Sequence, residues 1–281
     1  MTDLPRRLAV ALVAVPAILG LVWLKAPWPL GLLVLAVSLA ALAEMLAILR
    51  RLGHRPFTRV AFALAAAFHA AAILEAEGTW GSAILAPASL LALATIGPLL
   101  LMFSRGVSRK NPGDAAATLF AVAYAGFLPT FLTRLHHLDH GAKWVGLVLL
   151  LTWGYDTAAY LWGKSIGRAK LWPEVSPAKT WAGWWGGSIT VTLVAVGLKL
   201  APDRLGWPVL VPDAISPVMM AVLAPLAAAA AQAGDLAESL LKRAASIKDS
   251  GALLPGHGGL LDKLDALLFT APLIWFVALS L

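Results

Sequence analysis

Long apolar runs alternate with short polar connections along almost the whole chain. Nine of these runs, each about 17–22 residues long, are predicted to be helices, because about 20 consecutive apolar residues cross the hydrocarbon core of a bilayer. The predicted spans are residues 8–24, 30–49, 57–74, 82–103, 115–133, 144–163, 184–200, 214–233 and 265–281. The pattern therefore predicts an all-α polytopic membrane protein, a bundle of about nine transmembrane helices.

The composition agrees with a membrane location. Of the 281 residues, 60% are hydrophobic and 13% are charged, and the mean hydropathy is +0.80. Arg6 and Arg7 precede the first apolar run as they would in a signal peptide, but no clean small-residue cleavage site follows, so we expect a first transmembrane helix. The chain has no cysteine, which excludes disulfides, thiolate metal sites and a cysteine nucleophile.

The basic residues indicate how the chain is oriented. With the N-terminus inside, 17 of the 22 lysines and arginines fall on the cytoplasmic side and 5 fall outside, as the positive-inside rule requires. This distribution explains the pI of about 9.9. The sequence has no basic patch interleaved with aromatic residues, so it does not favour a nucleic-acid partner. We predict a multi-pass protein of the cell inner (plasma) membrane, with a cytoplasmic N-terminus and the C-terminus outside.

The densest group of polar residues lies at 234–265. Within it Asp235, Ser239 and Lys242 recur at i, i+4 and i+7, a spacing that places them on one face of a helix. A solvated cytoplasmic loop is the ordinary interpretation of such a charged stretch. The glycines and carboxylates that follow favour a functional site instead.

The glycine-rich run 254–259 cannot continue that helix, and its glycines let backbone N–H groups approach a phosphate closely. Asp262 and Asp265 come just after the run, where one of them would lie near Asp235 and share a divalent cation. Hard oxygen ligands suit Mg²⁺. This part of the chain is therefore predicted to hold a metal and a phosphate.

A second polar group begins inside a predicted span, at Asp156. Tyr160 and Gly163 follow at i+4 and i+7 on the same helix face, and a carboxylate at this depth needs a partner or a water-filled cavity. An interhelical hydrogen bond that only holds the bundle together is the alternative. We expect a cytoplasm-facing polar cavity between the Asp156 helix and the Asp235 helix.

Other polar residues near the spans receive no functional role. Glu44 lies near the cytoplasmic end of its predicted helix, where its carboxylate is expected to reach water. His136, His137 and His140 cluster in an outward loop, but their spacing matches no standard zinc site. A solvated loop is the favoured interpretation there.

The polar block resembles the signature of the phosphatidate cytidylyltransferase (CDP-diacylglycerol synthase) family, Ser-x2-Lys-Arg-x4-Lys-Asp-x5-Pro-Gly-His-Gly-Gly-x2-Asp-Arg-x-Asp. This chain matches it at Ser239, Lys242, Arg243, Lys248, Asp249, Pro255, Gly256, His257, Gly258, Gly259, Asp262 and Asp265. Lys263 stands where the family has arginine. So long a motif rarely matches by chance.

Two further segments resemble the same family. Residues 156–160 resemble its Asp-x-x-Ala-Tyr helix, and residues 176–183 resemble its Ser-Pro-Lys-Lys-Thr-x-Glu-Gly segment, with Ala178 replacing the first of the two basic residues and Ala182 the acidic one. The resemblance covers about residues 150–265. We accordingly expect N-terminal transmembrane helices over 1–140 and a catalytic region over 141–281.

The resemblance implies that CTP and phosphatidate are converted to CDP-diacylglycerol and pyrophosphate by a homodimer. Another lipid phosphate as substrate is the nearer alternative, and a transporter of an anionic lipid is the alternative from a different class. The implied roles are Mg²⁺ binding by Asp235 and Asp262, with Asp249 as a third candidate, and phosphate binding by Lys242 and Arg243. Lys263 is expected either to bind a substrate phosphate or to pair with Asp262 or Asp265 and orient the loop. The residues expected to bind substrate are Ser176, Lys179, Thr180, Asp156, Tyr160, Ser239, Gly256, His257, Gly258 and Gly259.

Overall fold

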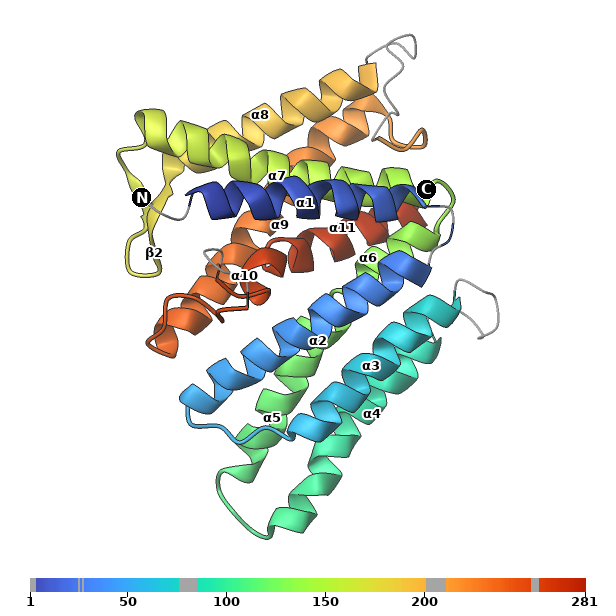
Figure 1. Ribbon diagram of the computed structural model, residues 1–281, viewed down its shortest axis with the longest axis vertical. Helices are drawn as coiled ribbons and strands as arrows, with labels where there is room; N and C mark the ends of the chain where they lie inside the picture. The colour runs from blue at the N-terminus through green and yellow to red at the C-terminus, as the bar shows by residue number, and fades with distance from the viewer. Residues whose placement is uncertain (1–3, 25, 27, 76–84, 201–210, 254–257) are drawn as a thin grey trace. The chain divides into compact units, whose positions relative to one another are not determined.

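The structure is a computed structural model that describes residues 4–24, 26, 28–75, 85–200, 211–253 and 258–281 (Figure 1). Its helices are α1 (Leu4–Trp23), α2 (Trp28–Arg51), α3 (Thr58–Glu75), α4 (Leu85–Met102), the 3₁₀ turn η1 (Phe103–Arg105), α5 (Asn111–Ala121), the π-helical turn η2 (Val122–Phe127), α6 (Thr130–His137), α7 (Gly141–Ile166), α8 (Trp181–Leu200), α9 (Pro217–Ala244), α10 (Leu261–Leu264) and α11 (Leu267–Leu279).

The structure confirms the predicted all-α polytopic fold. Each of the nine predicted spans coincides with helical residues, and the run 115–133 is formed by α5, η2 and α6 together. Within the described part of the chain, five helical segments are long and apolar enough to cross a membrane: 28–51, 58–75, 111–137, 181–200 and 217–244. Helix α9 continues past the apolar run that ends at 233, because the polar residues that follow are mostly good helix formers.

Two compact units make up the chain. Unit 1 comprises residues 1–137 and 241–264, and unit 2 comprises residues 138–240 and 265–281. In unit 1 the apolar core lies between α2, α3 and η2, where Met45 and Phe68 are almost fully buried. Gly126 lets η2 pack closely against α3, since a Cβ at this position would lie only 2.9 Å from the Cβ of Ala65.

In unit 2 the helices α7 and α8 pack along their length, and α11 packs on α7. Gly187 permits the close approach of α7 and α8, since a Cβ at this position would lie 2.9 Å from Ala159. The hydroxyl groups of Thr152 and Thr270 are 2.9 Å apart and join α7 to α11. Tyr155 is buried within this packing.

A short hairpin connects α7 to α8, and the sequence pattern did not predict it. Strands β1 (Lys170–Trp172) and β2 (Ser176–Thr180) pair antiparallel, with Lys170 opposite Thr180 and Trp172 opposite Ser176. Pro173 and Pro177 exclude a helix in this segment. The hairpin leads directly into α8 and so carries Lys179 and Thr180 to the start of that helix.

Candidate active site

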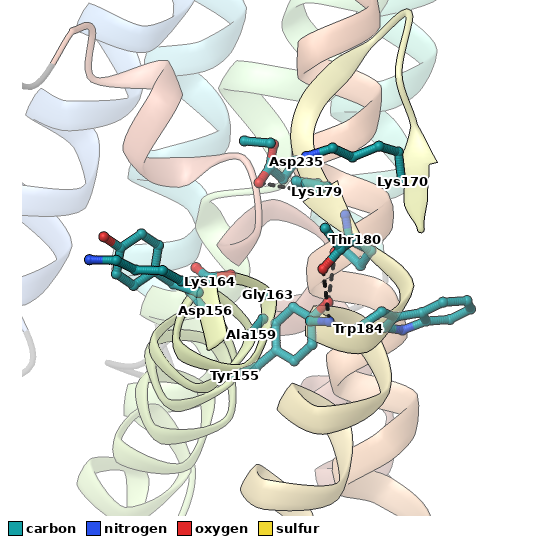
Figure 2. Close-up of a pocket in the computed structure, with 14 residues that line it drawn as sticks. Tyr155, Asp156, Ala159, Gly163, Lys164, Lys170, Lys179, Thr180, Trp184 and Asp235 are labelled. Carbon is teal, nitrogen blue, oxygen red and sulfur yellow. Dashed lines mark hydrogen bonds and ion pairs between the residues drawn. The ribbon is translucent and has the colours of Figure 1, made fainter. Parts of the chain in front are cut away.

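Unit 2 contains a cavity of about 480 Å³ at the hairpin end of α7 and α8 (Figure 2). Both predicted helices contribute a carboxylate to its wall, Asp156 from α7 and Asp235 from α9. Which side of the membrane this cavity opens to stays a prediction. The residues that line it are Tyr155, Asp156, Ala159, Tyr160, Gly163, Lys164, Lys170, Ala178, Lys179, Thr180, Gly183, Trp184, Gln232 and Asp235.

Helix α7 supplies one wall of the cavity. Asp156, Tyr160 and Gly163 all line it, as their shared helix face predicts. Gly163 faces α8, where an added Cβ would lie 3.1 Å from the hydroxyl oxygen of Thr180. Lys164 comes next along the chain and adds a cation at the end of the helix.

Thr180 is the residue immediately before helix α8 and lies at the edge of the cavity. Its hydroxyl oxygen accepts a hydrogen bond from the backbone N–H of Gly183 at 3.1 Å, which is the usual arrangement of a helix N-cap. The remaining N–H groups of the first turn and the helix dipole favour a negative charge at this end of the helix. Anion binding by Thr180 stays a prediction, and the structure gives Thr180 the role of capping this helix.

An ion pair joins the hairpin to α9 inside the cavity. The Lys179 Nζ atom lies 2.5 Å from the Oδ2 atom of Asp235, and the two side chains are 18% and 33% exposed (Figure 2). The Ser239 hydroxyl donates to the other carboxylate oxygen, Oδ1, at 3.2 Å. A predicted phosphate-binding lysine and a predicted metal-binding aspartate are thus direct partners in the structure.

Two buried residues of the cavity wall were not predicted as site residues. The Tyr155 hydroxyl donates to Gln232 Oε1 at 2.7 Å, while Gln232 Nε2 is buried and has no hydrogen-bond partner among the described residues. Gln232 lies three residues before Asp235 in an alanine-rich part of α9. Because residues three apart lie on the same face of a helix, this spacing places Gln232 on the face of Asp235. The spacing is the sequence feature from which Gln232 could have been predicted as a site residue.

The charge of the cavity wall favours an anionic ligand. The side chains of Lys164, Lys170 and Lys179 line it together with two carboxylates, those of Asp156 and Asp235. The lysines outnumber the carboxylates, and lysine is a point-charge donor to phosphate oxygens. The indole of Trp184 adds an aromatic surface to the same wall.

The second half of the polar block folds in unit 1. Asp262 Oδ1 accepts a hydrogen bond from Lys242 Nζ at 2.5 Å, and its Oδ2 accepts from the backbone N–H groups of Gly259 at 2.8 Å and Ser250 at 3.0 Å. Burial raises the pKa of the Asp262 carboxyl, but Lys242 and the two N–H groups outweigh burial and lower it below its ordinary value. Asp262 is therefore ionised at neutral pH.

The other predicted residues of the block occupy different positions. Arg243 donates to the carbonyl oxygen of Ile247 at 3.2 Å, and Asp249 and Lys263 have exposed side chains. Gly258 has a φ of +82°, which favours glycine. Ser176 does not line the cavity of unit 2, and Gly256 and His257 lie outside the described residues.

The expectation that Glu44 reaches water was wrong. Its side chain is buried, and its carboxylate accepts hydrogen bonds from the Ser250 hydroxyl and from the N–H groups of Leu260 and Leu261. The sequence could not indicate this contact, because more than 200 residues separate Glu44 from its partners. The predicted span ended a few residues later, which made a solvated position the default.

Fold and cavity together define a multi-pass membrane protein with a lysine-lined pocket. The chain belongs to the cytidylyltransferase family, whose sequence model matches residues 5–281. This match confirms the resemblance seen in the polar block. Within the described residues, no group of three or more histidine and carboxylate side chains is arranged to hold a metal.

Several curated proteins are similar to this chain. It is 33% identical over 183 residues to the phosphatidate cytidylyltransferase of Bacillus subtilis strain 168, covering 64% of this chain and 65% of that protein. It is 38% identical over 165 residues to the phosphatidate cytidylyltransferase of Staphylococcus aureus strain COL, covering 57% and 58%. It is 41% identical over 159 residues to the uncharacterized protein YnbB of Escherichia coli strain K12, covering 57% and 49%. The matched parts thus span about half to two thirds of these relatives.

Proposed function

We propose that the protein transfers the cytidylyl group of CTP to phosphatidate. An oxygen of the phosphatidate phosphate forms a bond to the α-phosphorus of CTP, the bond from that phosphorus to the β-phosphate bridging oxygen breaks, and pyrophosphate leaves. CDP-diacylglycerol is the other product. The family membership, the names of the relatives and above all the lysine-lined cavity of unit 2 support this proposal.

The reaction joins two polyanions, so charge neutralisation matters more than a general base. A phosphate monoester is already ionised near neutral pH and needs no proton removed before it attacks. We assign binding of the CTP phosphates to Lys179 and Thr180, which end strand β2 just before α8, and to Ser176, which begins the same strand. Lys164 and Lys170 share the cavity and add to its positive charge.

Mg²⁺ fits the donor atoms present at Asp235. The carboxylate oxygens of Asp235 and the Ser239 hydroxyl are hard oxygen donors, which Mg²⁺ prefers. We propose Asp235 and Asp262 as ligands of the ion, with Asp249 as a further candidate. When bound, Mg²⁺ supplies neutralisation of the negative charge that develops on the leaving pyrophosphate.

The remaining candidates are assigned to the lipid and phosphate groups of the substrates. Lys242, Arg243 and Lys263 are proposed to hold phosphate oxygens, and the backbone of the glycine-rich loop (Gly256, His257, Gly258 and Gly259) to cradle one substrate. Asp156, Tyr160 and Ser239 are proposed to border the bound substrates. We further propose that the enzyme is a homodimer in the cell inner membrane, with the N-terminus cytoplasmic and the C-terminus outside.

Pyrophosphate release tests the proposal directly. Purified protein in detergent is supplied with CTP, Mg²⁺ and phosphatidate, and pyrophosphate is measured, with reactions lacking either substrate as controls. We expect release that requires both substrates. A panel of lipid phosphates and nucleotides then measures the substrate preference. A transporter of an anionic lipid would release no pyrophosphate in any of these reactions, and that result would overturn the proposal.

A further inference from the structure

The carboxylate of Glu44 holds both ends of the glycine-rich loop. Upstream, the Ser250 hydroxyl donates to Glu44 Oε2 at 2.9 Å. Downstream, the N–H of Leu260 donates to Oε1 at 3.1 Å and the N–H of Leu261 donates to Oε2 at 2.9 Å. One side chain of α2 thus fixes the start and the end of a loop that contains part of the family signature.

Two glycines, Gly251 before the loop and Gly259 at its end, leave the space that the Glu44 carboxylate occupies. A Cβ added to Gly251 would lie 2.3 Å from Glu44 Oε1, and a Cβ added to Gly259 would lie 2.3 Å from Glu44 Oε2. No side chain fits at either position without displacing the carboxylate. Glycine is needed at both positions for the space it leaves, and the backbone φ is not the reason at either one.

Glu44 and Asp262 share the same short stretch of backbone. Ser250 donates its hydroxyl to Glu44 and its N–H to Asp262, and Gly259 donates its N–H to Asp262. Asp262 in turn accepts from Lys242 at 2.5 Å. Any displacement of Ser250 or of residues 259–261 therefore changes the position of the Asp262 carboxylate and of its lysine partner.

The chemistry of these contacts requires a carboxylate. An ionised carboxylate only accepts hydrogen bonds, and here each of its partners in the described part of the chain is a donor. Glutamine has the same shape but offers an NH₂ group as well as an oxygen, so one donor of the loop would face another donor. Buried donors without an acceptor are costly.

We propose that Glu44 is a positioning residue for the reaction. It holds Ser250 and residues 259–261 in the positions that present Asp262 and Lys242, and so gives helix α2 a part in forming the site. The effect on turnover rests on the proposed cytidylyl transfer. The effect on hydrogen exchange near the loop does not rest on that function, because exchange is measured without substrate.

The test compares Glu44→Gln with the wild type by two measurements. Hydrogen–deuterium exchange reports the N–H groups of peptides spanning 245–253 and 258–264, and we expect exchange in both to become at least about tenfold faster, as expected for the loss of a charged hydrogen bond. Pyrophosphate release should fall by about 10- to 100-fold. Glu44→Asp keeps the charge and should recover part of the rate and of the protection.

Ser38→Ala is the matched control on the same helix. The Ser38 hydroxyl is buried and donates to the carbonyl oxygen of Ala125 at 2.6 Å, away from the loop. This variant loses a buried hydrogen bond of α2 and should leave both the loop exchange and the turnover as in the wild type. Equal changes in Ser38→Ala and Glu44→Gln would show general destabilisation and overturn the proposal.

The two measurements separate failure of this inference from failure of the proposed function. Wild-type exchange in Glu44→Gln would overturn the positioning role whatever the turnover. Faster exchange in the variant would support it even if the wild type released no pyrophosphate. If Glu44→Gln does not fold, Ser250→Ala removes one of the three contacts, and unchanged exchange of 245–253 in that variant would overturn the proposal.

Discussion

Lys179 Nζ and Asp235 Oδ2 lie 2.5 Å apart and join the hairpin to helix α9 across the cavity of unit 2. Each partner is a group that the proposed reaction needs elsewhere, the lysine at a CTP phosphate and the carboxylate at Mg²⁺. The ion pair neutralises both groups, so neither charge is left alone in a half-buried site.

Replacing either proposed metal ligand should reduce turnover. We expect Asp235→Asn and Asp262→Asn each to lower kcat by at least about a hundredfold without unfolding the protein, because each loses a ligand charge. Raising Mg²⁺ should restore only part of the rate. Asp213→Asn is the control, since Asp213 also pairs with a lysine, Lys143, but is 70% exposed. Near wild-type rates in both variants at saturating substrate would show the metal assignment to be wrong.

The stability of the protein should depend on the ionisation of Asp262 at acidic pH. The pKa of this carboxyl is lowered in the folded protein from an ordinary value of 3.8. Its contribution to stability is therefore complete above about pH 4 and is lost as the pH falls further towards the folded pKa. Melting temperatures between pH 6 and pH 3 should fall more steeply for the wild type than for Asp262→Asn. Parallel curves would contradict this.

Close packing at Gly183 should be necessary for the cavity. A Cβ at Gly183 would lie 2.8 Å from the carbonyl oxygen of Ala159 and 3.2 Å from Thr180 Oγ1. Gly183→Ala should therefore push α8 from α7, lowering both the melting temperature and the turnover. Gly197→Ala, on the same helix, meets no atom of the described residues within 4 Å and should gain about 0.5–1 kcal/mol in stability. Equal effects of the two substitutions would exclude the packing explanation.

Lys263 is the one position of the signature where the chain departs from the family arginine. Arginine holds a phosphate through two parallel hydrogen bonds, whereas lysine is a point charge, a difference of roughly 1 kcal/mol for one bond. We expect Lys263→Arg to keep the rate within about tenfold and Lys263→Ala to lose considerably more. Its side chain is exposed. Unchanged kcat and KM in Lys263→Ala would make it an ordinary solvated lysine.

Single cysteines should report the orientation of the chain, because the natural sequence has none. Ser108, Glu174 and Asp139 are exposed positions. The distribution of basic residues predicts that cysteines at Ser108 and Glu174 react with a membrane-impermeant thiol reagent only after the cytoplasmic side is opened. A cysteine at Asp139 should react from outside. Labelling of Glu174→Cys in intact cells would overturn the topology and remove access of CTP to the cavity.

Hydropathy and helical spacing predicted much of this molecule from its sequence. The nine apolar runs coincide with helices because a bilayer demands long apolar segments, a constraint visible in the chain itself. The face formed by Asp156, Tyr160 and Gly163 lines a cavity because helical geometry orders residues four and three apart.

The remainder depended on contacts between distant segments. The hairpin over 170–180 is too short for a periodic pattern, and its prolines indicate where a helix stops without indicating a strand partner. Tyr155 of α7 meets Gln232 of α9 through a hydrogen bond between segments 77 residues apart, which local sequence does not encode. Glu44 was assigned to solvent because its partners come late in the chain.

The separation between Glu44 and the loop also concerns how the site is made. The N–H of Leu261 meets a carboxylate 217 positions earlier in the chain. Helix α2 leaves the ribosome long before residues 250–261 exist, so the loop acquires its acceptor only when synthesis is nearly finished and α2 is already in place. The contacts of Glu44 with Ser250, Leu260 and Leu261 thus form late in the folding of the chain.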